Sequence, residues 1–145
     1  MKKNVWTALG IVLVVLFAAV AVVSQVKGAC AGMIECASGQ VPMKCHWAYI
    51  ATTVTGIGGA LIALLAAFSK TCEGRRMVSL AAVIVAVIAI VMLAPTGIGT
   101  CAHAESVCNS NAVVVYVLCV AAIIVGLVMA AKADPQAAEK PKMQL

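Results

Sequence analysis

Four long apolar runs set the strongest limit on how this chain can fold. They cover residues 5–26, 48–68, 77–93 and 112–131, and none contains Asp, Glu, Lys, Arg or His. An α-helix of roughly 20 residues crosses the hydrocarbon layer of a bilayer. A lipid-exposed segment must also satisfy its own backbone hydrogen bonds, which a helix does. The runs therefore predict an all-α, polytopic membrane protein with four transmembrane helices at about these positions.

Composition supports one membrane domain and excludes a soluble one. Hydrophobic residues make up 64% of the chain and charged residues only 10%, whereas soluble domains carry about 25% charged residues. We expect a four-helix transmembrane domain over residues 1–131 and a disordered cytoplasmic tail over 132–145, which has little apolar content. The first run exceeds the roughly 7–15 apolar residues of a signal-peptide core. We therefore expect it to be retained as a helix.

The distribution of Lys and Arg predicts the orientation in the membrane. Eight of the ten basic residues fall on one side of the four runs: Lys2, Lys3, Lys70, Arg75, Arg76, Lys132, Lys140 and Lys142. Cytoplasmic loops carry the excess of basic residues, so both termini are predicted to be cytoplasmic and residues 27–47 and 94–111 to form two outer loops. Because the basic residues flank apolar runs, the net charge of +5 indicates a multi-pass protein of the plasma membrane and not a nucleic-acid-binding surface.

Cysteines are concentrated in these two outer loops. Of seven in the chain, five are predicted to lie outside the membrane: Cys30, Cys36, Cys45, Cys101 and Cys108. Thiols in that compartment commonly oxidise. We predict two disulfides among Cys30, Cys36, Cys101 and Cys108, with Cys45 remaining a thiol. Pairing within each loop closes the shorter segments and is slightly favoured, while pairing between the loops remains open.

The same loops hold side chains that suit a soft metal ion. Met43, Cys45 and His46 stand together before the second apolar run, and His103 lies in the other outer loop. Thioether, thiolate and imidazole groups favour copper and iron over Mg²⁺ or Ca²⁺, so copper or iron is the predicted cofactor. The alternative interpretation is that His46, Trp47 and Tyr49 form an aromatic belt at the membrane surface.

One helix face is predicted to pack closely against a neighbouring helix. Thr52, Gly56 and Gly59 recur at three- and four-residue steps in the second run. Small residues at such spacing let two transmembrane backbones approach each other. We expect this face to lie at a helix–helix contact and not along a substrate path.

The box Met43-Lys44-Cys45-His46-Trp47, the four helices and the cysteine-bearing outer loops together resemble a known group of proteins. They are similar to a family of small four-helix bacterial and archaeal membrane proteins of unknown function. The resemblance extends from the first helix to the fourth. It implies an accessory role beside ABC-type permeases, in export or metal transport, with no enzymatic activity.

Two functions from different classes follow from these observations. The first is a non-enzymatic accessory subunit of an exporter or metal-transport system, whose outer Cys/His/Met patch binds a soft metal or a partner protein. Its partners would be the bilayer and an ABC-type permease or other membrane subunits. The alternative is a quinone-linked thiol–disulfide oxidoreductase, but such enzymes carry a closely spaced Cys-x-x-Cys pair, and Cys30 and Cys36 stand further apart. No Gly-rich phosphate-binding loop is present, so the chain does not drive transport by itself.

Overall fold

The computed structural model describes residues 3–37, without 27–32, together with 39–100 and 107–133. These residues form four helices and one β-hairpin, with the following bounds: α1 Lys3–Val26, β1 Met33–Cys36, β2 Gly39–Pro42, α2 Lys44–Phe68, α3 Cys72–Leu93 and α4 Val107–Lys132. All four helices are long and apolar enough to cross a membrane. The predicted class, an all-α multi-pass membrane protein with four spans, is confirmed.

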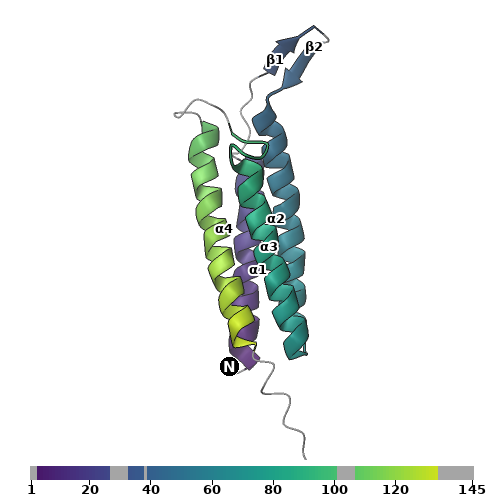
Figure 1. Ribbon diagram of the computed structural model, residues 1–145, viewed down its shortest axis with the longest axis vertical. Coiled ribbons are helices and arrows are strands. Elements are labelled where there is room, and N and C mark those ends of the chain that lie inside the picture. Colours follow the sequence, from purple (N-terminus) through teal and green to yellow (C-terminus); the bar gives the residue numbers. More distant parts are fainter. Residues whose placement is uncertain (1–2, 27–32, 38, 101–106, 134–145) are drawn as a thin grey trace, which may run out of the picture.

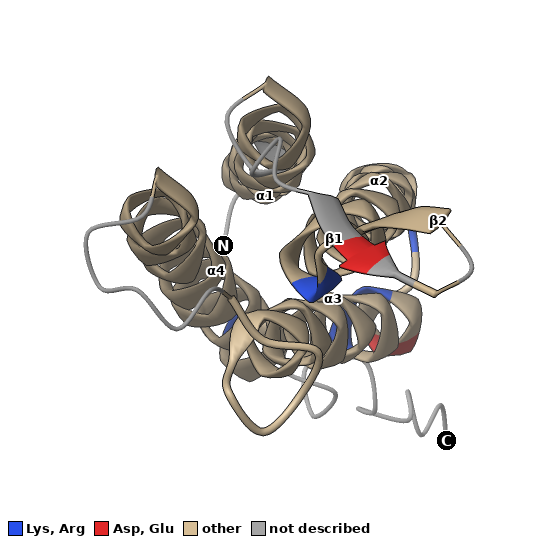
Figure 2. Cartoon of the chain, turned by 90° about the horizontal axis from the view of Figure 1, so that it is seen from above, with Lys and Arg blue, Asp and Glu red and all other residues tan. Residues whose placement is uncertain are grey.

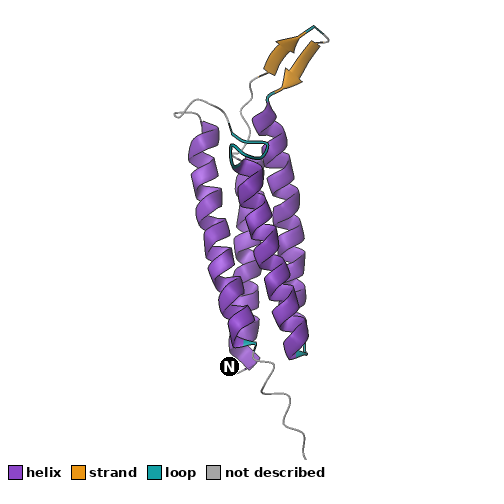
Figure 3. Ribbon diagram, viewed as in Figure 1, coloured by secondary structure: helices purple, strands orange, loops and turns teal. Residues whose placement is uncertain are grey.

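The helices form an antiparallel bundle with two distinct ends (Figure 1). We call the end where α1 begins and α4 ends the terminal end, and it also holds the short α2–α3 turn. The opposite end carries β1 and β2 and is called the hairpin end (Figure 3). Helix α1 packs against α2 and α4, and α3 packs against the same two helices. Helices α2 and α4 therefore face each other across the bundle diagonal, as the view along the bundle shows (Figure 2).

The outer surface of the bundle is apolar on every helix. Large aliphatic side chains are exposed along the spans, among them Val15, Leu61, Ile84 and Ile124. Such a surface is unfavourable in water but matches lipid acyl chains, which are themselves apolar. The interior is filled by Leu13, Phe17 and Val20 of α1 together with many alanines of the other helices. The small size of alanine lets the helix backbones lie close together.

The closest of these approaches joins α1 and α2. A Cβ added to Gly56 would lie 2.9 Å from the backbone nitrogen of Ala21, and one added to Gly59 would overlap the ring of Phe17. Both glycines are buried, as is Thr52, whose hydroxyl donates a hydrogen bond to the carbonyl of Ala48 at 2.8 Å. Residues larger than glycine would hold the two helices apart at this level.

Two features of the hairpin end differ from the expectation of irregular loops. Helix α2 begins at Lys44, so Cys45, His46 and Trp47 lie in its first turn and not in the loop that precedes it. The helix extends beyond the uncharged run because polar side chains are tolerated at the membrane surface, where water is present. The second difference is the hairpin itself, in which Met33 pairs with Pro42 and Cys36 with Gly39.

At the terminal end, one arginine contacts two elements of the bundle. The Nε of Arg75 donates a hydrogen bond to the carbonyl of Ser69 at 2.7 Å, and its guanidinium carbon lies 5.4 Å from the ring centroid of Trp6. A cation over an indole face is attracted by the ring's quadrupole. Arg75 thus connects the beginning of α1 to the α2–α3 turn. The tail predicted to be disordered, apart from the end of α4, lies outside the described residues.

Candidate functional site

The hairpin end holds the most polar part of the bundle interior, centred on the first two turns of α2. Cys45 and Tyr49 stand one turn apart, so they share a face, and both are buried. The hydroxyl of Tyr49 donates a hydrogen bond to the backbone carbonyl of Cys108 at 2.5 Å. Since Cys108 is the second residue of α4, this bond crosses the bundle diagonal. It links the two helix ends from which the outer segments leave.

Tyr49 therefore does not belong to an aromatic belt. Its side chain is only 1% exposed, whereas the neighbouring Trp47 is 55% exposed. The expectation of a belt at Tyr49 is wrong, and it holds better for Trp47, which lies at the surface near the membrane boundary. A buried phenol in a membrane needs a hydrogen-bond acceptor within the protein, and the carbonyl of Cys108 supplies it.

More polar side chains surround this bridge. Thr53 donates to the carbonyl of Tyr49 at 2.8 Å and accepts from the amide of Gln25 on α1 at 3.2 Å. On the other side, Thr100 donates to the side-chain oxygen of Asn109 at 2.6 Å. Sequence reasoning did not single out Gln25 or Asn109. Both are polar residues close to the hairpin end of an apolar run, and this position is the feature of the sequence that could have identified them.

Three of the four predicted metal ligands lie at the start of α2. Met43 is the N-cap residue, and its carbonyl accepts a hydrogen bond from the backbone N–H of His46 at 2.9 Å. Met43 and His46 are both half-buried, and the His46 ring contacts Trp47 edge-on with centroids 5.9 Å apart. The fourth predicted ligand, His103, lies outside the described residues. Within the described part of the chain, no group of three His, Cys, Asp or Glu side chains is arranged to hold a metal.

The described cysteines fall into two chemical states. Cys45, Cys72 and Cys119 carry thiols, whereas Cys108 is disulfide-bonded to a cysteine whose side chain lies outside the described set. Cys30 and Cys101 are not among the described residues, and only the backbone of Cys36 is described, in β1. The pairing of Cys30, Cys36, Cys101 and Cys108 therefore remains a prediction.

Charged side chains are restricted to the helix ends. In the described helices, Asp, Glu, Lys and Arg occur only within the first five residues or at the last one: Lys3, Lys44, Glu73, Arg75, Arg76 and Lys132. In Figure 2, where Lys and Arg are blue and Asp and Glu red, nearly all of the helical ribbon is tan. The middle of the described bundle thus offers thiol and hydroxyl groups, but no charged side chain that could carry an ion or a proton through it.

Comparison with known proteins gives a family and no established activity. No curated protein and no solved structure matches the chain. A family model described as a domain of unknown function (DUF4418) matches residues 8–132. The matched segment contains nearly all of α1 and the whole of α2, α3 and α4. The chain therefore belongs to the family defined by this domain of unknown function, DUF4418.

Proposed function

We propose that this membrane protein is a non-enzymatic accessory subunit of a metal-transport or export system, and that it binds a soft metal ion at its hairpin end. The observation that supports the proposal most is the position of Met43, Cys45 and His46 on the N-cap and first turn of one helix. Sulfur and imidazole donors of this kind favour Cu(I), with Fe(II) as the second choice.

Placement at the start of a helix fixes the backbone that carries the donors. Sites built on helices hold their side chains more accurately than sites on loops do. The buried position of Cys45 and the Tyr49–Cys108 hydrogen bond keep the first turn of α2 against α4. His103 would complete the ligand set, since the segment that contains it joins α3 to α4 at this same end.

An accessory role fits the bundle better than transport by the chain alone. Ion pathways through membranes are lined by polar or ionisable side chains, and the described interior has none that is charged. The exposed apolar faces could pack against an ABC-type permease or another membrane subunit. The exposed hairpin, with Glu35 and Gln40, stands beyond the bundle where a partner could reach it.

The excess of basic residues supports an orientation with the terminal end in the cytoplasm. Lys3, Lys70, Arg75, Arg76 and Lys132 are near this end, whereas Lys44 is at the other. By the positive-inside rule, the donors of α2 would face the outside of a plasma membrane. An externally placed soft-metal site suits capture or delivery of an ion to a transporter.

A Cu(I) competition assay tests the proposal. Protein purified in detergent under reducing conditions is titrated against a chromophoric Cu(I) chelator, and Cys45→Ser and His46→Ala are compared with the parent. We expect each variant to bind more weakly by at least about tenfold, because a thiolate or imidazole ligand is lost. Cys119→Ser is the matched control, since it changes another buried cysteine far from the hairpin end. Unchanged affinity in Cys45→Ser, or no binding by the parent, would contradict the proposal.

A second candidate is a quinone-linked thiol–disulfide oxidoreductase. It is favoured by one observation: the Cys45 thiol and the disulfide-bonded Cys108 lie at the same end of two helices that Tyr49 bridges. Thiol–disulfide exchange requires access of a thiolate to a disulfide sulfur, and full burial of Cys45 opposes access by a protein donor. We expect no quinone reduction when the purified protein is supplied with a reduced thioredoxin-like protein. Steady turnover that Cys45→Ser abolishes would favour this enzyme instead.

A further inference from the structure

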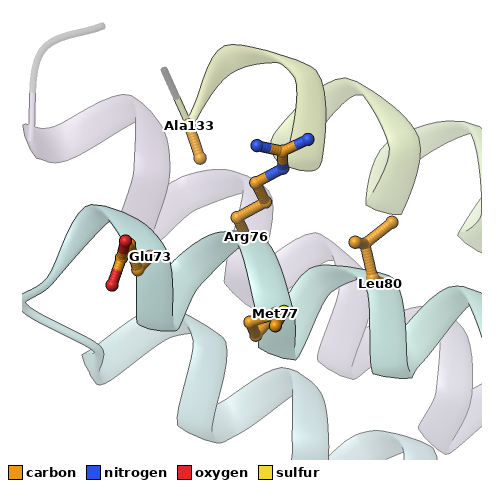
Figure 4. A pocket seen from close by; sticks show the side chains of 5 residues that line it. All are labelled: Glu73, Arg76, Met77, Leu80 and Ala133. Atoms are coloured by element: carbon orange, nitrogen blue, oxygen red, sulfur yellow. The ribbon is translucent and has the colours of Figure 1, made fainter. Parts of the chain in front are cut away.

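The terminal end contains a cavity that the metal proposal does not use. It lies between the first turns of α3 and the end of α4, as the close view shows (Figure 4), and has a volume of about 470 Å³. Its lining residues are Glu73, Arg76, Met77 and Leu80, which are exposed on α3, and the buried Ala133, so the cavity opens to the surface of the bundle. Pockets that bind small molecules have volumes of about 300–1,000 Å³, so this one is large enough for a ligand.

The walls of this cavity change from charged to apolar along α3. Glu73 and Arg76 lie in the first turns of the helix, and Met77 and Leu80 follow them toward the middle of the span. In Figure 4 the side chain of Arg76 extends from α3 toward α4. Such a change over one helical turn matches the boundary between the headgroups and the hydrocarbon of a bilayer.

Arg76 is available for a ligand, in contrast to its neighbour. Arg75 is occupied by the carbonyl of Ser69 and the ring of Trp6. Within the described part of the chain, neither Arg76 nor Glu73 takes part in an ion pair or a side-chain hydrogen bond. An arginine guanidinium binds phosphate through two parallel hydrogen bonds.

We propose that this cavity binds an anionic glycerophospholipid of the phosphatidylglycerol type. The Arg76 guanidinium holds the phosphate, and the Glu73 carboxylate accepts hydrogen bonds from the headgroup hydroxyls. The first part of an acyl chain lies against Met77 and Leu80. This site is separate from the hairpin end, so the lipid proposal does not depend on whether a metal binds there.

The charge around the cavity favours an anionic lipid over a zwitterionic one. Lys132 precedes the lining residue Ala133, and Arg75 also lies at this end, while Glu73 is the one acidic residue described there. Basic pockets between transmembrane helices bind anionic lipid headgroups through such an excess of positive charge. A headgroup with an ammonium would pair with Glu73 but meet this positive surplus.

Native mass spectrometry of the full chain in detergent tests the proposal. The protein is incubated separately with phosphatidylglycerol, phosphatidylethanolamine and phosphatidylcholine of the same acyl chains, and the bound lipid is counted. We expect phosphatidylglycerol to be retained most. Arg76→Gln keeps one amide donor but removes the charge and one of the two hydrogen bonds, and should weaken phosphatidylglycerol binding by at least about tenfold.

Two further variants make the result specific to the cavity. Ala133→Phe keeps every charge but fills the space, and we expect it also to lose phosphatidylglycerol. Lys70→Gln removes a nearby positive charge that does not line the cavity, and should keep binding within about twofold of the parent. Parent-level retention by Arg76→Gln or Ala133→Phe would overturn the proposal. So would a loss in Lys70→Gln as large as in Arg76→Gln, or equal retention of all three lipids.

Discussion

Two glycines of α2 allow the contact between α1 and α2 to be measured by a matched pair of substitutions. A Cβ at Gly56 would lie 2.9 Å from the nitrogen of Ala21 and 3.1 Å from the carbonyl oxygen of Phe17, whereas one at Gly58 has no atom within 4 Å. Both Gly56→Ala and Gly58→Ala gain the helix propensity of alanine, about 1 kcal/mol. Only Gly56→Ala must push two backbones apart, and overpacking of this kind costs about 1–3 kcal/mol.

The difference between the two variants therefore isolates the packing effect. We expect Gly58→Ala to be as stable as the parent or slightly more stable, and Gly56→Ala to be about 1–3 kcal/mol less stable than Gly58→Ala. Reversible unfolding in mixed micelles, followed by circular dichroism, gives both free energies of unfolding. Equal free energies in the two variants would refute the close α1–α2 contact.

Three further predictions address the diagonal bridge, the orientation and the disulfides. Tyr49→Phe keeps the ring but removes the hydrogen bond to Cys108, and should lower the free energy of unfolding by about 0.6–1.7 kcal/mol. Tyr116→Phe on α4 is its control, and an equal loss in both would contradict the bridge. Cys72 is exposed near the terminal end, so a membrane-impermeant thiol reagent should label it only in permeabilised cells; labelling in intact cells would reverse the proposed orientation. Peptide mapping without reduction should find Cys108 bonded to Cys30, Cys36 or Cys101 and Cys45 alkylated, while a bond to Cys45 would be contrary to the predicted pairing.

The four spans could be predicted from the sequence because a bilayer imposes a simple rule. An uncharged run of about 20 residues must be helical in hydrocarbon, and each of the four runs lies within one helix. The rule does not say where a helix begins outside the hydrocarbon. For that reason the extension of α2 to Lys44 and of α3 to Cys72 was not predicted. The hairpin of β1 and β2 was missed because four-residue strands give too short a pattern.

The candidate sites depend on which face of a helix meets its neighbours. Met43, Cys45 and His46 could be selected by their chemistry, since soft donors are rare and here lie close together. The burial of Tyr49 could not be inferred, because the same residue suits a membrane surface and an interior. In the folded bundle, the Tyr49 hydroxyl points to the carbonyl of Cys108, which is distant in the sequence. The cavity at the terminal end could not be predicted for the same reason. Arg76 and Ala133 line it together only once α3 and α4 are packed against each other.

The ligands of a bound metal can be observed directly by X-ray absorption spectroscopy. Full-length protein is loaded with one equivalent of Cu(I) under reducing conditions, and the copper-edge spectra of the parent and of Cys45→Ser are compared. The proposed site predicts sulfur scatterers together with imidazole in the parent, and the loss of one sulfur in Cys45→Ser with the helical content unchanged. A spectrum with only oxygen and nitrogen ligands, or one that Cys45→Ser leaves unaltered, would contradict a soft-metal site at the start of α2.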